Sequence, residues 1–115
     1  MSRDEAYLLD ILLAARDAVS FVEGLDWERF KASKLHQDAV VRTLEVIGEA
    51  AQRISDTTKD KIPRIPWREL AGMRNRLIHE YFRVDVEKVW DTVKEDIPLL
   101  VSELEPIVPP EDKSD

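Results

Sequence analysis

The sequence contains no cysteine and only two histidines among its 115 residues. The absence of cysteine excludes a disulfide scaffold, a thiolate zinc site and a cysteine nucleophile. His36 and His79 lie far apart in the chain, which disfavours a histidine-based metal cage as well. We therefore expect no metal and no other cofactor, and a cysteine-free chain of this kind is most simply cytoplasmic.

Long apolar runs are also missing. No uninterrupted apolar stretch approaches the ~20 residues that a membrane span needs, and residues 1–5 are not a basic segment ahead of an apolar run. The chain has three glycines, six prolines, 43% hydrophobic and 36% charged residues. This composition is typical of one soluble helical domain, and it predicts a protein that does not contact the membrane.

The sequence lacks an overall excess of positive charge: 17 lysines and arginines face 24 aspartates and glutamates, and the net charge is −7. An acidic chain ordinarily disfavours a nucleic-acid partner, because phosphate binding depends on basic surfaces. The charge is segregated, however: residues 59–83 hold seven cations and three anions, a net +4, so the rest of the chain carries −11. His79 lies in this basic part of the chain.

Apolar residues recur at steps of three and four, the repeat of amphipathic helices, and no strand-like alternation appears. The pattern predicts helices over residues 4–23, 35–54, 66–82 and 86–104, a short helical turn over 27–30 capped by Asp26, and a long loop over 55–65. Gly48, in mid-helix, predicts a close approach of another helix. Pro98 predicts a kink, because its ring cannot donate to the carbonyl of Lys94.

These elements predict an all-α fold, an antiparallel four- to five-helix bundle. We expect residues 1–105 to form a single domain and residues 106–115 to form a flexible C-terminal tail. A bundle this small often leaves apolar surface for a second copy, so the chain is expected to form a homodimer.

Polar chemistry is concentrated in the helix over 66–82. At 100° per residue, Trp67, Leu70, Arg74, Ile78 and Tyr81 share one stripe, which puts a permanent charge on a packing face. His79 lies about 140° around the helix from Arg74. The long Arg74 side chain could arc around, the helix could distort, or two copies could each supply part of one site; we favour the third arrangement.

Arginine and histidine together suit phosphoryl transfer on RNA. A neutral imidazole can accept the 2′-hydroxyl proton or donate a proton to a leaving oxygen, while arginine binds the phosphate oxygens. Asn75 could orient His79 or bond a phosphate oxygen. The simpler interpretation is a solvated histidine and an arginine in an interface ion pair. A non-catalytic helical module that binds nucleotide or RNA, or docks a nucleotidyltransferase, is the alternative function.

Two carboxylates one turn apart, Glu45 and Glu49, resemble the acid pair of a hydrolase. No histidine or aspartate stands at matching spacing, so a solvated face, or an ion pair with Arg42 or Arg53, is the favoured interpretation. In one variant of the dimer, Glu49 reaches Arg74 across the interface and holds it.

The run from Arg74 to Tyr81 reads Arg-x4-His-x-Tyr and resembles the signature of HepT-like proteins in the prokaryotic HEPN superfamily. The block from Arg42 to Ala51, the Ile65-Pro66-Trp67 segment before the motif, and Val89-Trp90 to Asp96-Ile97-Pro98 after it fit the same family. The resemblance therefore covers most of the chain.

The resemblance implies a HEPN-like helical dimer that acts as the toxin of a type VII HEPN/MNT toxin–antitoxin module. Such toxins are metal-independent endoribonucleases with the site at the dimer interface. Arg74 and His79 would be the catalytic pair, and Asn75 would support the site. Tyr81 matches the tyrosine to which the family's partner, a minimal nucleotidyltransferase (MNT) antitoxin, adds AMP, and the added negative charge and bulk would block RNA.

Overall fold

A computed structural model describes residues 2–80 and 83–108, and within these ranges the regular structure is entirely helical. The all-α prediction is confirmed. The elements are α1 (Arg3–Phe21), α2 (Trp27–Lys31), α3 (Lys34–Arg53), α4 (Asp56–Lys61), α5 (Trp67–His79), α6 (Val86–Asp91), the π-helical turn η2 (Thr92–Asp96) and α7 (Ile97–Leu104).

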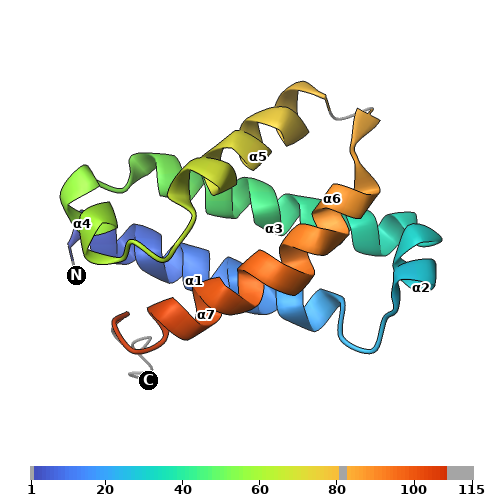
Figure 1. Ribbon diagram of the computed structural model, residues 1–115, viewed down its shortest axis with the longest axis horizontal. Coiled ribbons are helices and arrows are strands. Elements are labelled where there is room, and N and C mark those ends of the chain that lie inside the picture. The colour runs from blue at the N-terminus through green and yellow to red at the C-terminus, as the bar shows by residue number, and fades with distance from the viewer. Residues whose placement is uncertain (1, 81–82, 109–115) are drawn as a thin grey trace, which may run out of the picture.

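The helices pack in antiparallel succession. Figure 1 shows α1 and α3 side by side along the long axis, with α5 on the far side of α3 and the α6–η2–α7 rod crossing back over α1. Helix α3 is the central element, because it packs against both α1 and α5. The candidate site described below lies where α1 and α5 pack against α3.

Local sequence explains where the first helices begin and end. The Ser2 hydroxyl caps α1 by accepting from the Glu5 amide, and Asp26 caps α2 by accepting from the Arg29 amide, as predicted. Gly24 has a φ of +78°, so the turn after α1 uses the left-handed conformation that glycine adopts readily. His36 Nδ1 and the hydroxyl of Ser33, the cap of α3, are hydrogen-bonded across 2.6 Å.

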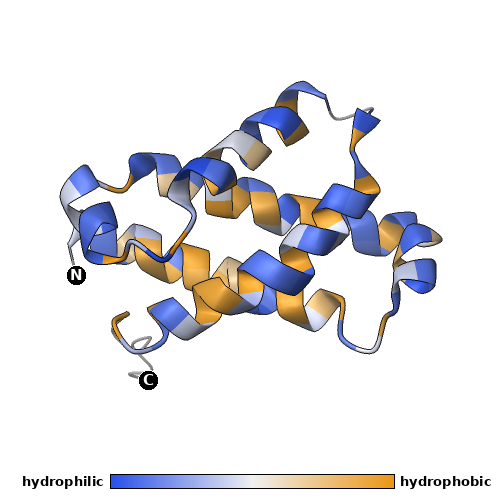
Figure 2. Cartoon of the chain, in the orientation of Figure 1, coloured by the Kyte–Doolittle hydropathy of each residue, from blue (hydrophilic) through white to orange (hydrophobic). Residues whose placement is uncertain are grey.

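The core is apolar and continuous. Figure 2 shows stretches of hydrophobic residues along α1, α3 and α7, the helices that enclose the core. Fully buried members include Ile11, Phe30, Ile47, Ile97 and Leu100. Val108 is buried as well, so packing against the core continues beyond Glu105; residues 109–115 of the predicted tail lie outside the described residues.

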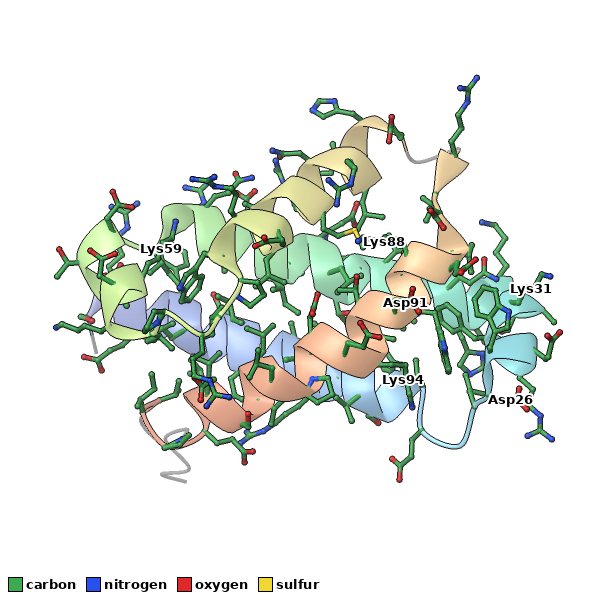
Figure 3. The ribbon with its side chains drawn as sticks, in the orientation of Figure 1. Asp26, Lys31, Lys59, Lys88, Asp91 and Lys94 are labelled. Carbon is green, nitrogen blue, oxygen red and sulfur yellow. The ribbon has the colours of Figure 1, made fainter. Side chains whose placement is uncertain are left out.

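The three tryptophans, Trp27, Trp67 and Trp90, are partly buried and pack against the core. Trp27 and Trp90 have ring centroids 6.3 Å apart, and Phe30 lies 5.0 Å from Trp90. The Lys94 ammonium lies 5.3 Å from the centre of the Trp90 ring, at the end of the molecule where Asp26 and Lys31 also lie (Figure 3). This cluster fastens α2 to the α6–η2 rod.

The prediction of a loop over residues 55–65 is wrong for the first half of that range, where α4 forms. Ser55 caps this helix by accepting from the Thr58 amide. None of the helical residues of α4 is buried, so no apolar repeat marks it in the sequence. The Asp4 carboxylate accepts hydrogen bonds from Ser55 and Thr58, which fastens the start of α4 to the start of α1.

The kink predicted at Pro98 takes the form of a widened turn. The π-helical turn η2 ends just before α7, and Pro98 lies in the first turn of that helix. Because proline has no N–H for the Lys94 carbonyl, the wider hydrogen-bonding pattern accommodates the missing bond without ending the rod.

No helix within the described ranges is both long enough and apolar enough to cross a membrane.

Candidate active site

Helix α5 carries Arg74, Asn75 and His79 of the motif. Pro66 precedes its first residue, where a missing N–H is harmless, and the helix ends at His79, three residues before the predicted end. The predicted packing stripe was rotated: the buried residues are Leu70, Met73 and Leu77, while Ile78 is 39% exposed. Arg74 therefore lies at the edge of the packed face, and its side chain is 25% exposed.

Gly48 of α3 sets the position of Arg74. A Cβ atom built on Gly48 would overlap the Cβ of Arg74 and come within 2.8 Å of the Leu70 carbonyl oxygen. The predicted close approach of a second helix is confirmed, and that helix is α5 at Arg74. The backbones are close enough for side chains beside Gly48 to reach the guanidinium.

A polar network joins α3 to α5 at this point. Arg74 Nη2 lies 2.7 Å from Glu49 Oε2, and Arg74 Nη1 donates to Asn75 Oδ1 across 3.1 Å. Glu49 also pairs with Arg53 Nη2 at 2.8 Å, and Gln52 Nε2 donates to Asn75 Oδ1 across 3.1 Å. We call Glu49, Gln52, Arg53, Arg74 and Asn75 the seam network.

The carboxylate in the seam network remains ionised at neutral pH. The hydrogen bond from Arg53, together with the charge of Arg74, lowers the pKa of Glu49 below its ordinary value, although partial desolvation opposes this. Glu49 thus carries a full negative charge between two guanidinium groups. The ion pair predicted between Glu49 and Arg53 is present, and Glu49 holds Arg74 within its own chain rather than across a dimer.

An open cleft of about 370 Å³ lies beside Arg74. Helix α1 contributes Tyr7 and Asp10 to its wall, α3 contributes Arg42 and Glu49 among others, and α5 contributes Arg74. Its size is that of a small-ligand site, and it combines apolar surface with charges of both signs. His79 is not part of this wall.

His79 is exposed at the last position of α5. Among the described residues it makes no hydrogen bond or ion pair, and in particular none with Asn75, which bonds Arg74 and Gln52 instead. The structure thus brings Arg74 and Asn75 together but does not join His79 to them. Tyr81 lies outside the described residues.

Two members of the network were missed or only partly anticipated. No sequence pattern singled out Gln52, and Glu49 was expected to be solvated or paired with Arg42 or Arg53, with a contact to Arg74 only across a dimer. Gly48 was the signal that could have located both, since side chains flanking a close helix contact on the same helix necessarily border the partner helix. No group of three or more histidine, aspartate or glutamate side chains in the described part of the chain forms a candidate metal site.

Comparison with known proteins confirms the predicted HepT-like family. Residues 11–107 match the family described as ribonuclease HepT-like. A Methanocaldococcus jannaschii protein named as a candidate RNase (MJ1380) is 43% identical over 101 residues, covering 88% of this chain and 93% of its own. A Thermococcus cleftensis protein named as a candidate ribonuclease HepT is 48% identical over 99 residues, covering 86% and 90%. No solved structure gives a significant match.

Proposed function

Because this chain belongs to the HepT-like ribonuclease family, we propose that it is a metal-independent endoribonuclease that acts in the cytoplasm as the toxin of a type VII HEPN/MNT toxin–antitoxin module. The observation that carries the proposal is the fixed, partly exposed guanidinium of Arg74 at the rim of a cleft, five residues before the exposed imidazole of His79. Asn75 supports the site through its hydrogen bond with Arg74.

The reaction we propose is an internal transfer at one phosphodiester. The 2′-oxygen of a ribose bonds to the adjacent phosphorus while the bond from phosphorus to the 5′-oxygen of the next nucleotide breaks. His79 accepts the 2′-hydroxyl proton or gives a proton to the departing 5′-oxygen, and Arg74 binds the non-bridging oxygens as their charge grows. The products are a 2′,3′-cyclic phosphate and a 5′-hydroxyl, so the step consumes no water.

A homodimer is part of this proposal. Within one chain, Arg74 borders the cleft on the α3 side, whereas His79 points from the end of α5 with no described partner. A two-fold arrangement supplies the missing imidazole from a second copy without additional sequence. Ile78, one position before His79 and 39% exposed, lines the same cleft as Arg74, so a second copy seated at the cleft would cover it.

The first experiment tests the catalytic pair. Purified His79→Ala protein should cleave RNA at least about 100-fold more slowly than the unaltered protein, the usual scale for loss of a general acid or base. The matched control is His36→Ala, which removes the other histidine of the chain and should leave cleavage intact. Cleavage by His79→Ala at the unaltered rate would refute the proposal, as would RNA binding by the unaltered protein without any turnover.

Metal independence has its own test. The unaltered protein should cleave equally fast in EDTA, and mass spectrometry of the fragments should find cyclic phosphate ends. Loss of cleavage in EDTA that is restored by a divalent cation would contradict this part of the proposal.

The shared site is tested by mixing two inactive variants. If each site takes Arg74 from one copy and His79 from the other, co-refolded Arg74→Ala and His79→Ala chains should regain about a quarter of the unaltered activity, since half of the dimers are mixed and each mixed dimer holds one complete site. If both groups come from one chain, the mixture should stay inactive.

Regulation by a partner completes the proposal. We propose that a minimal nucleotidyltransferase antitoxin adds AMP to Tyr81, placing negative charge near the basic segment that binds RNA. With such an enzyme and ATP, mass spectrometry should find AMP on Tyr81 and cleavage should fall. Continued silencing of Tyr81→Phe protein would place the regulatory site elsewhere.

A further inference from the structure

The seam network holds the Arg74 guanidinium from two directions. Glu49 accepts at one terminal nitrogen and Asn75 accepts at the other, at 2.7 and 3.1 Å. The third nitrogen, Nε, is buried and has no hydrogen-bond partner among the described residues. A guanidinium has five N–H groups, so one N–H on each terminal nitrogen is left for a ligand.

Each acceptor on Arg74 is itself held by a side chain of α3. Arg53, one helical turn after Glu49, pairs with that carboxylate at 2.8 Å, and Gln52 donates to the Asn75 oxygen at 3.1 Å. The orienting groups therefore cannot rotate without breaking a second bond. Gly48 fixes the distance between the two helices at this point, because any side chain there would meet Arg74.

We propose that Glu49 is a positioning residue for Arg74, fixing the guanidinium so that its two remaining terminal N–H groups meet the phosphate of the bound RNA; this role rests on the proposed ribonuclease function. A planar fork that is fixed in advance gives two parallel hydrogen bonds to a phosphate at little further loss of freedom. Small misplacements of such a group cost large factors in rate.

The local charge explains why a carboxylate can lie beside an RNA site. Glu49, Arg53 and Arg74 together carry a net charge of +1, so the phosphate still meets a positive site. Replacing Glu49 by a neutral residue raises this local charge to +2 while it loosens Arg74. The two effects act on different kinetic constants: attraction for RNA rises, and the alignment needed in the transition state is lost.

The decisive variant is Glu49→Gln, which keeps the size of the side chain. We expect kcat to fall about 10-fold or more, with KM for a short RNA unchanged or lowered. The matched control is Glu105→Gln, which removes a carboxylate from another exposed arginine pair, with Arg16 at 3.2 Å and away from the cleft. The control should keep both kinetic constants.

A second variant removes the support of Glu49 and also lowers the local charge from +1 to 0, so it is judged by kcat and not by KM for RNA. Arg53→Gln leaves Glu49 and Arg74 in place but frees the carboxylate, so it should give a smaller fall in kcat in the same direction. Loss of folding, measured by circular dichroism, would lower all rates through the amount of active protein and would leave KM unchanged. An Arg53→Gln protein with undiminished kcat contradicts the proposal.

A measurement that does not depend on cleavage is NMR of the arginine side chains. In the unaltered protein the Arg74 Nη nitrogens should give separate signals, because rotation of the held guanidinium is slow, and in Glu49→Gln they should merge. Equal immobilisation of Arg74 in both proteins overturns the proposal, and so does a higher kcat/KM in Glu49→Gln, which would mean that the carboxylate competes with phosphate. Cleavage by His79→Ala would instead overturn the ribonuclease function and leave the NMR result standing.

Discussion

Helix α3 is packed along two edges that differ in kind. Helix α3 contributes the fully buried Ile47 to the apolar core that it shares with α1, whereas toward α5 it offers Gly48 and the half-exposed charges of the seam network. The first edge is stabilised by burial, which has no preferred direction. The second edge also buries Leu70, Met73 and Leu77 of α5, but it adds a close backbone approach and directed hydrogen bonds. Both edges of α3 therefore stabilise the fold, but only the edge toward α5 also orients the candidate catalytic Arg74.

The largest expected effect lies on the apolar edge. Ile47→Ala empties a site with 0% exposure and should lower the free energy of unfolding by about 2–5 kcal/mol. Urea denaturation followed by circular dichroism measures this change. The activity per folded molecule should be retained at low temperature, because the seam network is untouched. A loss below about 1 kcal/mol would mean that the two edges do not differ as described.

The close approach at Gly48 should give the next largest effect. Gly48→Ala places a methyl group against Arg74 and should destabilise the protein by about 1–3 kcal/mol while also lowering cleavage, since α5 must move. The matched control is Gly72→Ala on α5, where the nearest atom, Arg76 Nη1, is 3.7 Å away. That change should stabilise the protein by about 0.4–1 kcal/mol, as is usual for glycine replaced within a helix. Equal effects at both glycines would show that the contact at Gly48 is not tight.

The smallest effects concern acid stability away from α3. Hydrogen bonds from Ser55 and Thr58 lower the pKa of Asp4 below its ordinary value of 3.8. The resulting stabilisation is complete above the unfolded-state pKa and is lost as the pH falls through the lower pKa of the folded state. Asp4→Asn should therefore flatten the decline of melting temperature below about pH 4. An unchanged decline would remove Asp4 from the acid response.

Asp96 provides a control of opposite sign. Burial raises the pKa of this carboxyl above 3.8, so its charged form opposes folding and its contribution improves as the pH falls through the raised folded-state pKa. Asp96→Asn should leave the protein at least as stable as the unaltered chain at neutral pH. A drop in melting temperature at neutral pH would indicate that the charged carboxylate is a favourable partner.

Sequence patterns predicted the long helices well because each buries an apolar stripe, and the caps at Asp26 and the contact at Gly48 followed from side-chain chemistry. Helix α4 was not predicted, because none of its helical residues is buried and it therefore has no apolar stripe. On α5, apolar residues occur on several sides of the helix. Periodicity therefore predicted that Ile78 is buried, whereas the structure buries Met73 and Leu77 instead.

Residues of the candidate site could be predicted from the sequence, but the way in which they are arranged in space could not. Arg74 and Asn75 were found from the motif, yet their partners Glu49 and Gln52 lie more than twenty residues earlier and meet them only through the packing of α3 on α5. In the proposed site Arg74 meets His79 only through a second copy, which a single chain cannot specify by periodicity. Such information arises at the level of tertiary and quaternary packing.

The widened turn η2 has a consequence for the phase of the C-terminal rod. Val89, Val93 and Ile97 are all buried at successive steps of four residues, and in a regular α-helix two such steps would drift about 80° away from a straight line. The π-helical stretch takes up this excess, so the stripe stays aligned through Leu100 and Leu104. Removing one residue between positions 92 and 96 should therefore leave a regular α-helix, because the buried residues from Val89 to Leu104 would then follow one another at steps of three and four.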